Sequence, residues 1–188
     1  MKKRDIKDIL KTAISLFLIC AVAAGLLAAV NSVTAPKITA NAEKTENEAR
    51  KGVLPEAESF EEKTLEDGTV YYEGIANGTA AGYVFTVSSA GYGGEIKLTV
   101  GVNSEGAVTG LTILSINETP GLGMNAKKES FISQYIGKSG NLSVVKNQTP
   151  GDSEILAITS ATVTSKAVTS AVNDALTLFA RVTEQEGK

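Results

Sequence analysis

The sequence contains no histidine and no tryptophan, and its one cysteine, Cys20, lies inside an apolar run. A zinc finger, a haem bound through histidine, an iron–sulfur cluster, a disulfide framework or a Ser-His-Asp triad each needs residues that this chain lacks. Taking the five basic residues before position 12 from the total of 18, and the two acidic ones from 21, leaves a net charge of about −6 for the rest, which argues against nucleic-acid binding. Any redox role therefore requires an organic cofactor.

The longest uncharged stretch, Thr12 to Val30, has 19 residues. At 1.5 Å per residue it can cross a hydrocarbon core of about 30 Å. The basic residues before it predict a cytoplasmic N-terminus and an extracytoplasmic remainder; they are Lys2, Lys3, Arg4, Lys7 and Lys11. A cleaved signal peptide is the alternative, with Ala21-Val22-Ala23 as a cleavage site, but the apolar run continues past that site and favours a retained anchor.

The chain divides into three parts: a basic tip and transmembrane anchor over residues 1–31, a helical stalk or linker over 32–65, and a folded domain over 66–188. Within the domain, β-branched residues and turn glycines predict strands at 71–76, 82–88, 95–102 and 108–116, the last two paired as a hairpin across Asn103-Ser104-Glu105-Gly106. A helix is expected over 127–136 that buries Phe131, Ile132, Tyr135 and Ile136, followed by short strands at 142–145 and 155–158 and a final helix. This order predicts an α+β fold, an antiparallel sheet with helices packed on one side.

Four hydroxyl residues precede the final helix: Thr159, Ser160, Thr162 and Thr164. Apolar residues recur at helical spacing from Ala167 to Phe179, so the hydroxyls sit at a helix N-terminus. There the unpaired N–H groups and the helix dipole can stabilise a phosphate, and Lys166 adds a cation. Helix capping is the alternative, and on local physics alone it is favoured, because Ser and Thr are common N-cap residues.

Two glycine-containing loops, Gly91 to Gly94 and Glu118 to Gly123, flank the predicted hairpin. Hairpin pairing brings both loops to one edge of the sheet, where glycines would let the backbone approach a flat ligand and Tyr92 could cover it. Plain turn chemistry explains the same residues. Residues 121–126 also fit a loose dinucleotide fingerprint, which is rejected because Pro120 precedes it and no parallel crossover or later acidic residue supports it.

Residues 159–168, TSATVTSKAV, resemble the flavinylation motif, commonly Ser/Thr-Gly-Ala-Thr-x-Ser/Thr, of the FMN-binding subunits of Rnf and Nqr redox complexes. The resemblance implies a phosphoester between FMN and Thr164. The chain departs from the motif at Ser160, where the family has Gly, and at Leu156, where it has Asp. Both departures are expected to affect recognition by a flavin transferase more than flavin binding.

The block from Ala90 to Gly123 resembles the central part of the RnfG family, and residues 34–38 and 53–57 resemble its beginning. These matches imply an FMN-carrying electron-transfer subunit of a membrane complex that moves electrons between ferredoxin and NAD and transports Na⁺ or H⁺. The expected partners are the other subunits of that complex, with a flavin transferase, using FAD and Mg²⁺, for maturation. The expected location is a bacterial or archaeal cell membrane.

No catalytic residue or metal site is expected in this chain. The residues expected to hold the covalent FMN are Tyr92, Gly93, Glu118, Thr119, Gly121, Leu122, Gly123, Ser160, Ala161, Thr162, Thr164 and Ser165. Two other functions stay open: the equivalent subunit of an Nqr-type NADH:quinone complex, and a membrane-anchored flavin-binding sensor or assembly module without electron transfer. The coupling ion, the donor and acceptor and the flavin potential do not follow from the sequence.

Overall fold

The computed structural model describes residues 6–186, and the chain divides into two compact units, Met1–Lys44 and Thr45–Lys188. The basic residues Lys2, Lys3 and Arg4, which predict the membrane orientation, lie outside the described residues.

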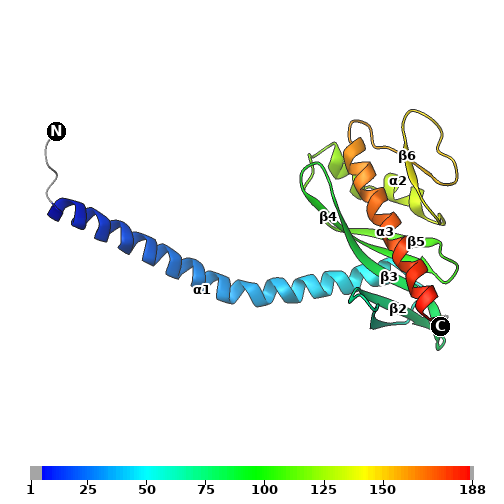
Figure 1. The fold of residues 1–188 in the computed structure, drawn as a ribbon, viewed down its shortest axis with the longest axis horizontal. Helices are drawn as coiled ribbons and strands as arrows, with labels where there is room; N and C mark the ends of the chain where they lie inside the picture. The colour runs from blue at the N-terminus through cyan, green and yellow to red at the C-terminus, as the bar shows by residue number, and fades with distance from the viewer. Residues whose placement is uncertain (1–5, 187–188) are drawn as a thin grey trace. The chain divides into compact units, whose positions relative to one another are not determined.

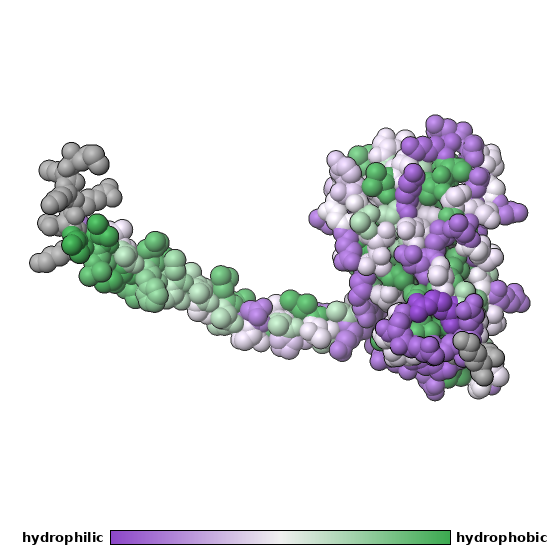
Figure 2. Space-filling model, in the orientation of Figure 1, coloured by the Kyte–Doolittle hydropathy of each residue, from purple (hydrophilic) through white to green (hydrophobic). Residues whose placement is uncertain are grey.

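Helix α1 (Ile6–Val53) begins with the predicted membrane anchor. Its apolar side chains are exposed, Phe17 at 71% and Leu27 at 71%, as a lipid-facing helix requires. Mean hydropathy reaches 2.6, so the helix is long and apolar enough to cross a membrane. Figure 2 shows this apolar surface along the N-terminal part of the helix. The polar stretch after it, predicted as helix or stalk, is helical, and Pro36 lies within it.

Five strands form one antiparallel sheet in sequence order: β1 (Ser59–Thr64), β2 (Val70–Ala76), β3 (Thr79–Ala90), β4 (Glu95–Asn103) and β5 (Val108–Ser115). The predicted hairpin is confirmed as β4 and β5, with Val100 opposite Leu111. Strand β1 lies inside the range predicted as stalk, and β3 is longer than predicted. Asn77 and Gly78, both with positive φ, make the tight turn between β2 and β3.

Helix α3 (Thr162–Glu186) covers one face of the sheet, mainly over β3 and β4 (Figure 1). Its Val168 and Val172 are fully buried in the cluster that contains Phe85 and Leu98. At about 25 cal/mol per Å² of apolar surface, this interface is the main source of the domain's stability.

The opposite face of the sheet receives the last turns of α1, where the sequence had predicted helices on one face only. Gly101 and Gly110 are direct cross-strand partners and leave a groove in that face. A Cβ on Gly110 would lie 2.5 Å from the Val53 Cα, and the Thr109 hydroxyl donates to the Val53 carbonyl at 2.6 Å. The end of α1 is therefore part of the folded domain.

The helix predicted over residues 127–136 is broken into three short pieces: η1 (Gly123–Lys127), α2 (Glu129–Ile132) and η2 (Ser133–Tyr135). The break occurs because Lys128 has an extended backbone, with ψ 141°. Phe131 and Tyr135 are buried as predicted and Ile132 is partly buried, but Ile136 is 46% exposed, so that part of the prediction is wrong. Burial raises the pKa of Tyr135, whose hydroxyl shares a 2.8 Å hydrogen bond with Thr169 and ties η2 to α3.

Strands β6 (Ser143–Val145) and β7 (Glu154–Leu156) form a separate parallel pair at the two predicted positions. Strand β7 leads directly into the turn before α3, so this pair sets where the helix begins.

Candidate functional site

A tight turn over Ile158 to Ala161 precedes helix α3. The Ala161 amide donates to the Ile158 carbonyl at 3.0 Å, and Ser160, inside the turn, has a φ of 61°. This left-handed conformation favours glycine, which explains why the flavinylation motif has Gly at this position. The Ser165 amide donates to the Ala161 carbonyl at 3.0 Å, so Ala161 is the N-cap of α3.

Thr164 is 1% exposed, yet its hydroxyl makes no hydrogen bond with the described part of the chain. Elsewhere in α3, the hydroxyls of Ser165, Thr169 and Thr177 donate to the carbonyl four residues earlier. Thr164 does not, because residue 160 lies outside the helix in the turn. A buried hydroxyl at a helix N-terminus is thus left available to a ligand.

Glu118 joins the two glycine loops, which meet at one edge of the sheet as predicted. Its Oε1 accepts hydrogen bonds from the amides of Tyr92 at 2.7 Å and Gly93 at 3.3 Å. The Asn117 side chain adds a bond to the Gly93 carbonyl at 3.4 Å. Because a Cβ on Gly93 would collide with the Asn117 carbonyl, that glycine is needed for the contact between the loops themselves.

Gly123 places the second loop against the start of α3. A Cβ at this position would lie 2.6 Å from Glu118 Oε2 and 2.7 Å from Thr164 Oγ1. The carboxylate and the hydroxyl therefore approach the same point from two segments far apart in sequence, and only glycine leaves that point open.

These three segments enclose the Thr164 cavity, of about 520 Å³. Nine of the predicted cofactor-binding residues line it, together with Val163, which the sequence reasoning missed; they are Tyr92, Glu118, Thr119, Leu122, Gly123, Ser160, Ala161, Thr162 and Thr164. Tyr92 is 77% exposed, Leu122 41% and Val163 53%, so apolar surface surrounds the cavity. This arrangement suits a ligand with one anionic end and one flat apolar part.

Three predicted residues do not line the Thr164 cavity. Ser165 is fully buried, and its hydroxyl accepts from the Ile158 amide and donates to the Ala161 carbonyl, so it stabilises the turn. Gly93 donates its amide to Glu118, and Gly121 accepts from the Asn125 side chain at 2.7 Å. These residues shape the site without facing it.

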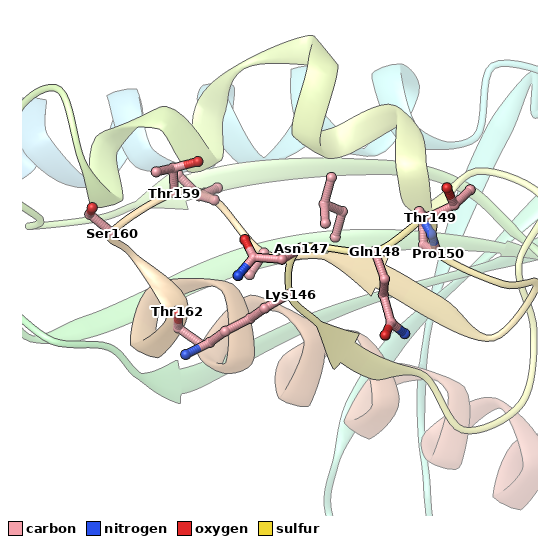
Figure 3. Close-up of a pocket in the computed structure, with 11 residues that line it drawn as sticks. Lys146, Asn147, Gln148, Thr149, Pro150, Thr159, Ser160 and Thr162 are labelled. Carbon is pink, nitrogen blue, oxygen red and sulfur yellow. The ribbon is translucent and has the colours of Figure 1, made fainter.

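A larger, more open hollow of about 780 Å³ lies beside the turn and shares Ser160 and Thr162 with the Thr164 cavity. We call it the Lys146 hollow; it is lined by residues 146–150, 156–160 and 162. Figure 3 shows the Lys146 side chain extended across it toward the N-terminal end of α3. No local sequence signal pairs Lys146 with this helix, because the two meet only through the parallel pairing of β6 and β7. Lys166, the cation predicted from sequence, is exposed and lines neither space.

Comparison with known proteins adds family information to this geometry. Residues 91–177 match the FMN-binding domain family, and residues 1–52 match the RnfG N-terminal region. The chain is 41% identical to the G-type subunit of the Na⁺-translocating ferredoxin:NAD⁺ oxidoreductase complex of Acetobacterium woodii, with 93% of each chain covered. It is 34% identical to the G-type subunit of the proton-translocating ferredoxin:NAD⁺ oxidoreductase complex of Clostridium ljungdahlii, over 93% of this chain and 94% of that one. The G-type subunit of the ion-translocating oxidoreductase complex of Methanosarcina acetivorans is 33% identical, over 97% and 99%.

Two solved structures share the fold. NqrC of Shewanella oneidensis superposes with a TM-score of 0.52 at 20% identity, covering 66% of each chain. The corresponding Na⁺-translocating NADH-quinone reductase subunit of Parabacteroides distasonis superposes with a TM-score of 0.51 at 24% identity, covering 60% of this chain and 61% of that one.

Proposed function

The chain belongs to the RnfG family of ion-translocating oxidoreductase subunits, and we propose that it carries FMN as a phosphoester on Thr164 and relays electrons between ferredoxin and NAD⁺ within such a complex. Family membership supports the coarser statement directly: an FMN-binding, electron-transfer subunit of a membrane redox enzyme that works with other subunits. The attachment residue and the electron route are the proposal.

The Thr164 hydroxyl is the observation that carries the attachment. It is the buried hydroxyl in the Thr164 cavity without a hydrogen bond inside the described part of the chain, and it lies in the first turn of α3. Thr162 lines the same cavity, but it also borders the Lys146 hollow and is only partly buried. Position in the fold therefore favours Thr164 over its neighbours as the tether.

The first turn of α3 supplies the electrostatic part of the site. Ala161, at the N-cap, has no side-chain acceptor for the amides that follow it, so those amides can bind a phosphate. The helix dipole favours the negative charge by about 0.3–1 kcal/mol at an exposed site. Lys146 extends toward the same helix end and would add to that attraction.

The residues present also fit the rest of an FMN. A volume of about 520 Å³ is within the usual range for small-ligand sites, and the exposed apolar surfaces of Tyr92, Leu122 and Val163 can cover a flat ring. When bound, the flavin supplies the electron-transfer chemistry. The chain's own part is to tether the phosphate, orient the ring and exclude water from its inner face.

The two departures from the flavinylation motif are compatible with this proposal. Ser160 adopts the left-handed conformation at a cost of about 1 kcal/mol, but it keeps the turn. Leu156, at the end of β7, lines the Lys146 hollow and not the Thr164 cavity. Its effect would fall on a flavin transferase that approaches from the hollow.

For the membrane arrangement, we propose a single pass through α1 with a cytoplasmic N-terminus, which places the FMN-binding domain outside the cytoplasm. The basic residues before the apolar run support this orientation. A covalent tether suits an extracytoplasmic carrier, because a dissociated flavin would be lost.

Intact mass tests the attachment. The chain is coexpressed with a flavin transferase and denatured, and the expected mass gain is one FMN less one water, mapped by peptide mass to Thr164. Thr164→Val should abolish the gain, and Thr162→Val, a matched change two residues away, should retain it. A wild-type chain without flavin would instead support a sensor or assembly module, and flavin retained covalently by Thr164→Val would refute the attachment site.

A further inference from the structure

We propose that Oε2 of Glu118 accepts a hydrogen bond from a hydroxyl of the ribityl chain of the bound FMN, so that Glu118 positions the flavin between its phosphate and its ring. This inference rests on the proposed function and assigns a role to a residue that the attachment motif does not contain.

The two oxygens of Glu118 have different surroundings. Oε1 accepts from the amides of Tyr92 and Gly93, whereas no donor from residues 6–186 reaches Oε2. The residue is only 8% exposed, and it lines the Thr164 cavity. A largely buried carboxylate oxygen without a donor is costly, so a ligand that brings a donor to it is stabilised.

Distance decides which part of the flavin can supply that donor. Glu118 Oε2 and Thr164 Oγ1 lie 2.6 and 2.7 Å from the same point, the Cβ position of Gly123, so they are at most about 5.3 Å apart, the sum of the two distances. If Thr164 Oγ1 carries the phosphate, the ribityl hydroxyls nearest the phosphate fall within this range. The ring N–H lies beyond the whole five-carbon ribityl chain and is out of reach.

The phosphate itself cannot be the partner of Glu118. An esterified phosphate has oxygens that only accept hydrogen bonds, and its negative charge repels a carboxylate. The amides at the start of α3 suit the phosphate, and the carboxylate suits the neutral hydroxyls that follow it. The site thus separates the two parts of the ligand by charge.

The test uses the full-length chain, loaded by a flavin transferase with flavin that carries ¹³C in the ribityl chain and ¹⁵N in the ring. Spectra are compared for wild type, Glu118→Gln and Glu129→Gln, the last an exposed glutamate in α2 that serves as the matched control. Glutamine keeps an oxygen for the amides of Tyr92 and Gly93 but replaces the acceptor Oε2 with a donor.

The expected result is a change in ¹³C shift at one or two hydroxyl-bearing ribityl carbons in Glu118→Gln, with the ¹⁵N shift of the ring N3 unchanged and no effect in Glu129→Gln. A shift at N3 without one in the ribityl chain would overturn the inference, as would identical spectra. If Glu118→Gln does not load, a structure of the loaded wild type decides: an Oε2 to hydroxyl distance of about 2.5–3.0 Å supports the contact, and one beyond about 3.5 Å refutes it. A wild type without any flavin overturns the proposed function as well.

Discussion

Gly123 provides the most direct test of the site geometry. Substituting alanine adds one methyl group at a point 2.6 Å from Glu118 Oε2, 2.7 Å from Thr164 Oγ1 and 2.8 Å from Glu118 Cβ. All three separations are shorter than a carbon can maintain, and two of the three atoms belong to one buried side chain. Because φ of Gly123 is not positive, the backbone itself accepts alanine, and the effect comes from the added methyl group.

The cost follows from the cost of overpacking a filled space, about 1–3 kcal/mol. For a domain of this size, a loss of about 2 kcal/mol lowers the melting temperature by about 4–8 °C. The functional effect should be larger, because the hydroxyl of Thr164 must rotate or move to make room. We expect the rate of covalent flavin loading of Gly123→Ala to fall at least about tenfold, which corresponds to about 1.4 kcal/mol in the barrier.

The assay is in-gel flavin fluorescence over a time course with purified transferase and FAD, beside thermal unfolding of the unloaded protein. Gly121→Ala is the matched control. Gly121 has a φ of 78°, so alanine there is strained by about 1–2 kcal/mol, but no atom lies within 4 Å of its Cβ position. The two variants should lose comparable stability, and only Gly123→Ala should lose loading. Equal loading rates for both would refute the view that the open point at Gly123 serves the hydroxyl of Thr164.

Three further changes test other parts of the chain. Ser160→Gly should relieve the left-handed strain and raise the free energy of unfolding by up to about 1 kcal/mol, after the larger unfolded-state entropy of glycine is subtracted; a lower urea midpoint would contradict this. Gly110→Ala should cost about 1–3 kcal/mol in urea unfolding, because its Cβ would meet the backbone of Val53, and wild-type stability would show that the end of α1 is not seated there. The hydrogen bond from Arg181 lowers the pKa of Asp67 from 3.8 to about 2, so the stabilisation from this carboxylate is present above pH 3.8 and is lost as the pH falls through 2. Asp67→Asn should therefore be less stable than wild type at pH 7 and equal to it near pH 2 in thermal unfolding, and a difference that persists at pH 2 would argue against the pair.

Local sequence signals predicted the elements whose patterns are complete within a few residues. Alternation over β4 and β5, with turn residues between them, determined the hairpin and hence the meeting of the two glycine loops. Helical spacing in α3 determined the face that holds Val168 and Val172. The membrane anchor follows from the length of the uncharged run alone.

The features that sequence did not predict depend on tertiary contacts. Gly101 and Gly110 look like ordinary weak points of strands, and only their cross-strand pairing shows that together they make room for Val53. Lys128 carries no breaker signal, yet its extended backbone divides the predicted helix. The glycines of the two loops were expected to admit a ligand, whereas Gly93 admits the neighbouring loop and Gly123 leaves space at Thr164.

The seating of Val53 against the sheet has a practical consequence for anyone who wants the FMN-binding domain without its membrane anchor. A fragment that starts where helix α1 ends would remove Ala49 and Val53, and would uncover the glycine groove to water. One that starts at Thr45, the boundary of the second compact unit, retains them. It also keeps Glu46, whose carboxylate pairs with Lys97 of β4 at 2.8 Å. The nine residues from Thr45 to Val53 would therefore decide whether such a fragment is soluble and able to accept flavin.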